Sequence, residues 1–269
     1  MTSGWKQPGS RVALAVLALL VVGALAAPLV APYAFDAVDL ANRRGAPSFS
    51  HWFGTDELGR DLLTRLLYGA RVSLAVGFVS AAMSATIGVA IGATAGYGSR
   101  WLDDALMRLT DAMLSIPRLP LLMIGGAILG PNVPLVIVLV GLVGWMETAR
   151  VVRAEVQSIA TRDFVLAARA MGATPVRVVV RHVLPGITGT VAVATTLAVG
   201  RGILLESALS FFGVGVQPPA ASWGNMLYQA QTTMSTEPWL SVFPGAFIFV
   251  TVLCCQVIGD ALAGDVVAA

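Results

Sequence analysis

Six long apolar segments constrain the fold of this chain more than any other feature of its sequence. A helix needs about 20 apolar residues to cross the roughly 30 Å hydrocarbon core of a lipid bilayer. The segments that reach or approach this length are Val12–Ala31, Val72–Tyr97, Ala105–Leu129, Val133–Thr148, Ile187–Phe211 and Leu240–Leu262. The sequence therefore predicts an all-α integral membrane protein with about six transmembrane helices.

The composition argues against a water-soluble fold. Only 12% of the 269 residues are charged and 57% are hydrophobic, whereas a soluble globular chain carries about 25% charged residues. Because the apolar residues lie in long blocks, lipid rather than an unusually large soluble core is expected to surround them. The formal net charge of +2 is too small to indicate a nucleic-acid partner.

Three of the apolar segments need separate consideration. Basic residues precede Val12–Ala31, as in a signal peptide, but this segment is longer than the 7–15 residues typical of a signal-peptide core. We therefore expect it to remain as a span. Pro117 and Pro120 interrupt the third segment and Pro134 the fourth, so the bounds of these two are the least defined.

The distribution of arginines predicts the orientation of the chain. The connection between the fourth and fifth segments has the largest excess of basic residues, with only Glu155 and Asp163 as acidic ones. Its arginines are Arg150, Arg153, Arg162, Arg169, Arg177 and Arg181. Cytoplasmic loops carry such an excess, so both termini are predicted to be cytoplasmic and the loops 32–70 and 212–239 to lie outside.

Two patterns indicate surfaces that contact lipid or other helices. Leucines alternate with polar residues in Asp61–Arg71 at helical spacing, which predicts either an interfacial amphipathic helix or a short helix packed on the protein, capped by Thr55 or Asp56. The second apolar segment has a small residue at every fourth position. These residues are Ser80, Ser84, Gly88, Gly92 and Gly96. Such a ridge predicts close helix packing, with a gating or pathway surface as the alternative.

Charged residues inside the apolar segments are expected to have specific partners. Arg201 and Glu206 are five residues apart on the fifth segment, which places them on different faces of a helix toward the outer leaflet. We expect Arg201 to lie at a pathway or subunit interface, and Glu206 either to do the same or to be a satisfied partner of the outer loop. Arg108 and Asp111 are spaced to form an i, i+3 pair.

The basic connection contains a predicted helix–turn–helix. Residues 163–171 are good helix formers, Gly172 can adopt the left-handed conformation that ends a helix, and Pro175 suits the first turn of the next one. Ala167 and Ala168 are expected on the surface of the first helix, where small residues would allow insertion into a groove on another protein.

This helix–turn–helix resembles the coupling motif of ABC-importer permeases, E-A-A, three residues, G, about ten residues, then an apolar residue followed by L-P. The matching residues are Ala167, Ala168, Gly172, Val183, Leu184 and Pro185. Leu166 stands where the motif has Glu. The resemblance implies that the helix starting at Asp163 docks on an ATP-binding subunit and converts nucleotide-driven closure into helix motion. His182 lies in the same loop, where we expect a polar neighbour rather than a proton relay.

Further blocks are similar to those of dipeptide/oligopeptide-type permeases, and specifically to the second of the two permeases in such systems. They are His51–Asp61, Leu67–Leu74, Leu209–Pro219 and Trp223–Gly224. The resemblance implies a type I ABC-importer permease fold, with residues 1–70 as an N-terminal helix and outer segment, residues 71–269 as the core, and a coupling loop at about 150–186. Arg201 departs from it, because the family is usually apolar at this position.

The resemblance also implies partners and a location. These are a second homologous permease, two ATP-binding cassette ATPase subunits, an extracytoplasmic substrate-binding protein and the lipid of a bacterial cell membrane. ATP and Mg²⁺ are expected on the ATPase subunits and no cofactor on this chain. Peptides are the leading substrates, while nickel or other metal chelates, haem and glycosides are the alternatives within the family.

Enzyme and channel functions find little support in the sequence. The chain has no G-x-x-x-x-G-K-[ST], and its single lysine is Lys6, so it lacks a phosphate-binding loop of that kind. Neither H-E-x-x-H nor G-x-S-x-G occurs, so an intramembrane hydrolase has no visible site. A channel would need a filter-like repeat or a ring of charges. The adjacent Cys254 and Cys255 have no metal-site spacing.

Overall fold

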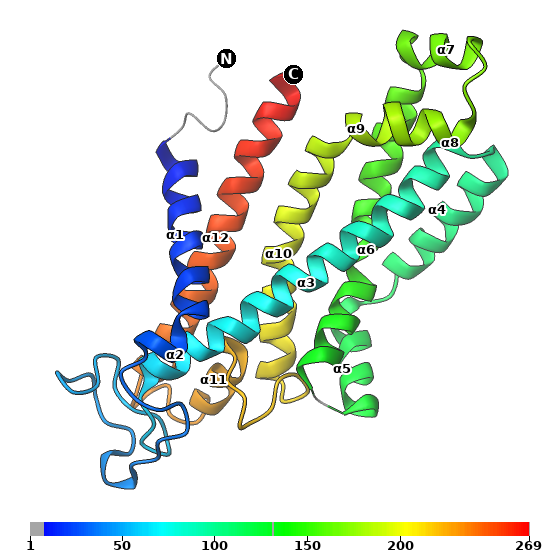
Figure 1. The fold of residues 1–269 in the computed structure, drawn as a ribbon. Coiled ribbons are helices and arrows are strands. Elements are labelled where there is room, and N and C mark those ends of the chain that lie inside the picture. The colour runs from blue at the N-terminus through cyan, green and yellow to red at the C-terminus, as the bar shows by residue number, and fades with distance from the viewer. Residues whose placement is uncertain (1–7, 131, 269) are drawn as a thin grey trace.

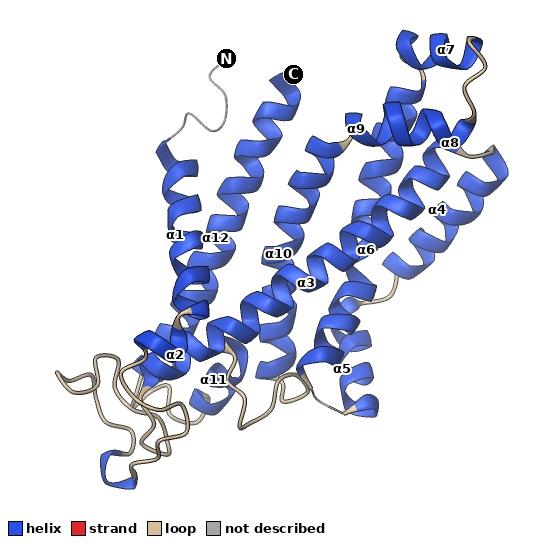
Figure 2. Cartoon of the chain, viewed as in Figure 1, coloured by secondary structure: helices blue, strands red, loops and turns tan. Residues whose placement is uncertain are grey.

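The computed structural model describes residues 8–130 and 132–268, with side chains described up to residue 265. Its regular elements in these ranges are all helices (Figures 1 and 2). Five of them are long and apolar enough to cross a membrane: α1 (Pro8–Leu25), α3 (Leu62–Tyr97), α6 (Val133–Ala160), α10 (Thr188–Phe211) and α12 (Trp239–Ala268). The prediction of an all-α chain with about six spans is confirmed, because one further pair of helices can form a broken span.

That pair corrects the predicted third span, Ala105–Leu129. The structure has two helices there, α4 (Arg100–Leu114) and α5 (Arg118–Leu129), which are bent by 78° at the break between them. Pro117 lies in the break, and a proline disfavours the helical conformation of the residue before it. Pro120 does not interrupt α5, because the first turn of a helix tolerates a proline.

The predicted fourth span, Val133–Thr148, is too short. Helix α6 continues to Ala160, so Arg150 and Arg153 lie on the helix rather than in a loop. Their charges end the apolar stretch but do not end the helix, since residues 149–160 contain no proline or glycine. The predicted pair Arg108–Asp111 is also wrong. Asp111 binds Arg150 of α6, and the Nη2 of Arg153 lies 2.6 Å from Oδ2 of Asp103, so two ion pairs link α4 to α6.

The predicted first span, Val12–Ala31, is divided. Helix α1 ends at Leu25, and a short helix α2 (Ala27–Val30) follows with Pro28 in its first turn. A proline removes a backbone donor and fits only the start of a helix. The N-terminal ends of the fifth and sixth spans agree with the prediction to within one residue.

The segment Asp61–Arg71 is not a separate surface helix of either predicted kind. It forms the first turns of α3, which runs on to Tyr97 without interruption. The cap is Asp61 rather than Thr55 or Asp56, because its carboxylate accepts a hydrogen bond of 2.8 Å from the N–H of Thr64. The polar face is buried, and the side chain of Arg65 is only 1% exposed.

The small-residue ridge of α3 packs against α6 along most of its length. The hydroxyl of Ser84 donates a hydrogen bond of 2.9 Å to the carbonyl of Gly141. A Cβ atom added to Gly88, Gly92 or Gly96 would lie within 2.9 Å of α6 atoms. Ser80, at the first end of the ridge, lies beside α10, where a Cβ on Gly202 would be 2.8 Å from its hydroxyl. The two backbones are therefore as close as these small residues permit.

The short helices, the long loop and the ends of the spans define two ends of the bundle. The start of α1, the end of α12 and the short helix α7 (Asp163–Ala170) share one end, while the loop 31–61 and α11 (Trp223–Ala230) lie at the other (Figure 1). Helix α3 crosses diagonally between the two ends. Because the chain starts α1 and finishes α12 at the same end, its helices must cross between the ends an even number of times. They do so when α4 and α5 count as one broken span.

Candidate functional site

The first candidate region is the segment between α6 and α10. Helix α7 is followed by Gly172 with a φ of +82° and then by α8 (Pro175–Val178), whose first turn contains Pro175. A π-helical turn over residues 179–183 and the short helix α9 (Leu184–Gly186) lead into α10. This is the helix, turn and helix that the sequence predicts. Gly172 is required for its conformation rather than its size, because an added Cβ would meet no atom within 4 Å.

Helix α7 has a buried and an exposed face, and Ala168 lies on the buried one. The side chain of Val165 is fully buried against Ile159, Val178 and Val183, and Ala168, one turn further on, is 5% exposed. The expectation that both alanines lie on the surface is therefore wrong for Ala168. A residue three positions along a helix shares its face, so Ala168 follows Val165 toward the protein.

Large apolar side chains are exposed on α7 and at Met171, which follows it, beside the exposed Arg169. Phe164 is 49% exposed, Leu166 48% and Met171 82%, and Ala167 lies between them on the exposed side. Asp163 is also exposed, at the first turn of the helix. Leu166, which replaces the glutamate of the motif, is thus part of this outward apolar surface.

Side-chain contacts attach α7 to the spans. Arg169 donates a hydrogen bond of 3.0 Å from its Nε to the hydroxyl of Tyr97, and its guanidinium lies 4.6 Å from the centre of the tyrosine ring. Tyr97 is the last residue of α3. The half-buried His182 has its ring 6.3 Å from that of Phe164, while Leu184 is half-buried and Pro185 exposed. A displacement of α7 would therefore be transmitted to α3 as well as to α6 and α10.

The second candidate region is a charged cluster among the spans, defined by Arg118, Glu147 and Arg201. The Nη2 of Arg118 lies 2.8 Å from Oε1 of Glu147, and Arg201 binds the other oxygen, Oε2, of the same carboxylate. Arg201 stands out in the sequence, whereas neither of its partners was predicted. An arginine inside an apolar segment requires an acidic partner. Few acidic residues lie in the apolar segments, and Glu147 at the end of the fourth one is among them, so this scarcity could have identified Glu147 as a partner of Arg201.

A cavity of about 340 Å³ adjoins this cluster between α6, α10 and α12. Its lining residues are Glu147, Thr148, Val151, Thr190, Val193, Ala194, Leu197, Arg201 and Ala263. A much smaller space of about 20 Å³ lies beside Ser80, Ser84 and Arg118, and it is again bounded by Glu147 and Arg201. The cluster therefore lies between a wide cavity and a much smaller space.

Glu206 interacts with a different set of residues from those of the charged cluster. Its side chain is fully buried and accepts hydrogen bonds from the hydroxyls of Ser73 at 3.0 Å and Ser210 at 2.8 Å. Ser73 in turn accepts a hydrogen bond of 3.1 Å from the N–H of Trp223 in α11. Its hydrogen-bond partners in the spans are serines, and it is linked to the outer segments through Ser73 and through Ser222, the N-cap residue of α11.

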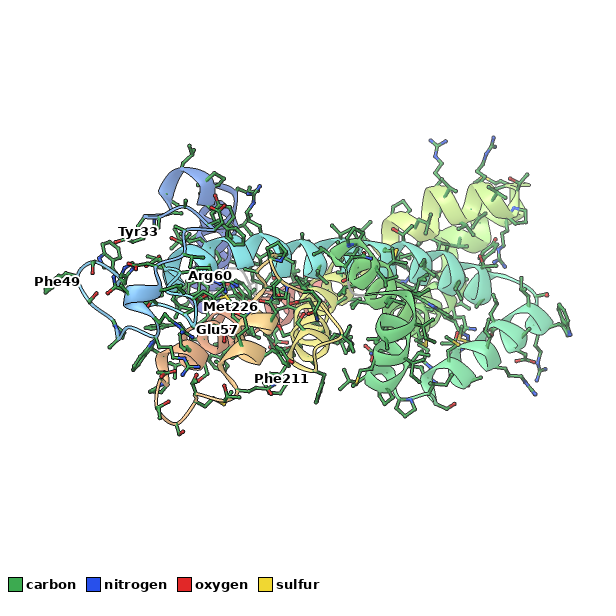
Figure 3. All side chains as sticks on the ribbon, turned by 90° about the horizontal axis from the view of Figure 1, so that it is seen from below. Tyr33, Phe49, Glu57, Arg60, Phe211 and Met226 are labelled. Atoms are coloured by element: carbon green, nitrogen blue, oxygen red, sulfur yellow. The ribbon has the colours of Figure 1, made fainter. Side chains whose placement is uncertain are left out.

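The outer end is held together by a second set of charges. Asp56 binds Arg60 at 2.7 Å and Arg65 at 3.3 Å, and Asp61 contacts Nδ1 of His51 at 2.9 Å. Figure 3 shows Arg60 and Glu57 among the helices of this end and Phe49 at its far edge. Phe49 and Trp52 are strongly exposed. The H-x-F-G-T-D-x-L-G-R-D block thus folds the outer loop onto the start of α3.

Comparison with known proteins identifies the family. Residues 88–267 match the family described as binding-protein-dependent transport system inner membrane component. The chain belongs to this family of membrane permeases. Residues 5–47 of the permease match a second family, the N-terminal TM domain of oligopeptide transport permease C.

Curated relatives of the permease cover almost all of its length. A putative peptide permease protein of Brucella suis biovar 1 is 41% identical over 93% of this chain and 83% of its own. The dipeptide transport system permease protein DppC of Bacillus subtilis is 38% identical, over 93% of this chain and 78% of its own. The oligopeptide transport system permease protein OppC of the same species is 34% identical, over 94% and 83%.

A solved structure shares the fold of the permease. A chain of the MetNI methionine ABC transporter, in an inward-facing conformation, superposes with a TM-score of 0.61 over 76% of this chain and 97% of its own, at 21% identity. At that identity the likeness concerns the fold alone. The predicted type I ABC-importer permease fold is confirmed.

Proposed function

We propose that this permease forms half of the translocation pathway of an ATP-driven importer for peptides. The observation that carries the proposal is helix α7, a short helix held rigidly beyond the spans with Phe164, Leu166 and Met171 exposed. An apolar helix face that projects from a membrane protein into water is stable only if another protein covers it. In a binding-protein-dependent transport system, that protein is the ATPase.

The orientation follows from the same assignment. The end of the bundle that carries α7 is cytoplasmic, as its arginines indicate, and both termini lie on that side of a bacterial cell membrane. The loop 31–61 and α11 then face the extracytoplasmic side, where a substrate-binding protein docks. The second half of the pathway comes from a homologous permease, and lipid surrounds the remaining faces.

ATP and Mg²⁺ are bound by two partner ATPase subunits, and this chain is not itself an enzyme. The absence of a phosphate-binding loop supports this part of the proposal. The substrate assignment is supported by the relatives, whose names specify peptide, dipeptide and oligopeptide transport.

The mechanism is alternating access driven through α7. When the ATPases close on ATP, they displace α7, and its attachment to Tyr97 carries the displacement into α3. Because α3 and α6 are packed backbone to backbone along the small-residue ridge, they move as a unit. The cavity beside Glu147 and Arg201 then closes toward the cytoplasm as the outer end opens to receive the peptide.

The test replaces Met171 with glutamate in the complete transporter. Met171 follows α7 at the end of the exposed apolar face, and a charge there should weaken ATPase binding by about tenfold or more. This is measured by co-purification of the ATPase with the permease and by ATP turnover stimulated by loaded binding protein. Met234→Glu is the matched control for co-purification, since Met234 is 41% exposed at the opposite end and a charge there should leave ATPase binding unchanged. ATPase binding that survives Met171→Glu unchanged would contradict the proposed role of α7.

A further inference from the structure

The charged cluster of Arg118, Glu147 and Arg201 lies within the membrane-spanning helices, where an unpaired charge is strongly destabilising. Glu147 is near the middle of α6, Arg201 is near the middle of α10, and Arg118 begins α5 at the bend of the broken span. The side chains nevertheless remain open, with exposed fractions of 24% for Arg118, 37% for Glu147 and 42% for Arg201. Charged side chains at mid-membrane depth normally face the bundle interior or water rather than lipid. An open charged face among the spans is what a water-filled transport pathway requires.

The cluster carries an excess of one positive charge. Two guanidinium groups share a single carboxylate, and Glu147 is the only acidic residue among those that line the two adjoining cavities. A guanidinium has five N–H donors arranged to bind carboxylates in a bidentate manner. Arg201 contacts one oxygen of Glu147, so most of its donors are available to a further anion.

The adjoining cavity gives an anion access to Arg201. Thr190, Ala194, Leu197 and Arg201 lie on one face of α10, at intervals of three to four residues, and they line the cavity together. Its volume of about 340 Å³ falls within the range of about 300–1,000 Å³ for small-ligand pockets. Because Thr190 lies near the start of α10, the cavity extends from the α7 end of the bundle to the charged cluster.

We infer that this cluster binds the carboxylate of a substrate as it crosses the membrane, with Arg201 as the principal donor and a specificity determinant for substrates that carry a free carboxylate. The inference rests on the proposed function, and it adds the chemical group that the pathway recognises. A peptide with an unmodified C-terminus carries such a group.

The shared carboxylate of Glu147 explains how binding can remain transient. When a substrate carboxylate takes the guanidinium of Arg201, Glu147 keeps Arg118 as its partner, so no charge is left unpaired at mid-membrane depth. When the substrate leaves, Arg201 returns to Glu147. The competition weakens the site, which a transport pathway needs because a tightly held substrate would not be released.

The experiment compares trialanine with trialanine C-terminal amide in vesicles that contain the complete transporter and its binding protein. The measured quantity is the ratio of their uptake rates, first with the wild-type permease and then with Arg201→Gln. Both permeases are served by the same binding protein, so its own preference cancels when the two ratios are compared. Losing a charge-assisted hydrogen bond should lower the carboxylate-to-amide ratio about tenfold.

Two further variants sharpen the result. Leu253 in α12 is 48% exposed and lines neither of the two cavities, so Leu253→Gln should leave the ratio unchanged. Glu147→Gln removes the competing carboxylate, so the ratio should rise. If Arg201→Gln does not reach the membrane, Glu147→Gln tests the inference in its place. An unchanged carboxylate-to-amide uptake ratio in Glu147→Gln would then overturn the inference.

The outcomes separate this inference from the proposed function. If Arg201→Gln takes up both peptides with the wild-type ratio, the permease is a peptide importer but the cluster does not select carboxylates. An equal loss of both peptides would assign Arg201 a structural role. If Arg201→Gln no longer co-purifies with the second permease, Arg201 lies in the subunit interface. An equal loss of both peptides and a loss of the second permease would each overturn the inference. ATP-dependent uptake of neither peptide by the wild type would instead count against the proposed function.

Discussion

The hydroxyl of Ser73 in α3 lies 3.0 Å from Oε2 of Glu206 in α10, across 133 residues of sequence. The same hydroxyl accepts a hydrogen bond from the N–H of Trp223. One serine therefore joins two spans to the outer helix α11. A fully buried carboxylate in a span is tolerated only when donors replace its lost water, and Ser73 is one of the serines that supply them.

Replacing Ser73 with alanine should destabilise the permease by about 1–3 kcal/mol, because Glu206 and the N–H of Trp223 both lose a buried partner. Thermal unfolding of the purified protein in detergent measures the effect. Thr86→Ala is a control on the same helix, since Thr86 is exposed and its hydroxyl bonds only to the carbonyl of Ala82. Equal melting temperatures for the two variants would show that the Ser73 bridge contributes little.

The packing of α3 on α6 leads to a second prediction. A Cβ at Gly92 would lie 2.5 Å from the carbonyl oxygen of Ala149, so Gly92→Ala must push the helices apart, at a cost of about 1–3 kcal/mol. Gly245→Ala in α12 meets no atom within 4 Å and should be neutral or slightly stabilising, because alanine favours the helix. The thermal stability of the two variants, compared in the same detergent, gives the answer. Equal stability would mean that the two helices are not in such close contact.

The two alanines of the coupling motif should behave differently. Ala167→Arg adds a long charged side chain to the exposed face of α7, so it should leave the permease intact and impair ATPase binding. Ala168→Arg places the same side chain on the buried face, where the site is 5% exposed, and should displace α7 itself. Protease sensitivity of the segment 161–186 distinguishes them, with cleavage enhanced only in Ala168→Arg. Enhanced cleavage in Ala167→Arg instead would reverse the assignment of the faces.

Gly172 should be intolerant of a side chain for conformational reasons alone. Its φ of +82° costs an L residue about 1–2 kcal/mol, so Gly172→Ala should speed hydrogen exchange in α7 by about five- to thirtyfold. Gly264 also has open space around it but no positive φ, so Gly264→Ala serves as the control. Unchanged exchange in α7 would show that the turn can adopt another conformation.

The orientation can be tested with single cysteines in a background that lacks Cys254 and Cys255. An impermeant thiol reagent added to intact cells should label Ala46→Cys and Ala220→Cys, whose parent residues lie at the outer end. Thr174→Cys, beside α8, should react only after the membrane is opened. Labelling of Thr174→Cys from outside would overturn the orientation and the role of α7 together.

The sequence by itself determined the class of the protein and much of its local structure. Length and apolarity alone decide whether a helix can cross a bilayer, so the spans could be located without knowing what they pack against. The turn at Gly172 and Pro175 could be predicted for a similar reason, because each residue restricts its own backbone. The small-residue ridge of α3 was visible as well, although its partner α6 was not.

Only the tertiary structure decided which residues meet. Arg201 could be recognised as requiring a partner, but Glu147 and Arg118 lie on other helices, and helical periodicity carries no information about such pairs. The burial of Val165, whose face Ala168 shares, depends on where α6 places Ile159 and α8 places Val178, and the 78° angle between α4 and α5 is not specified by Pro117 alone. Backbone preference and hydrophobic length act within a segment, whereas ion pairing and packing act between segments, so the sequence defined the helices and their assembly defined the site.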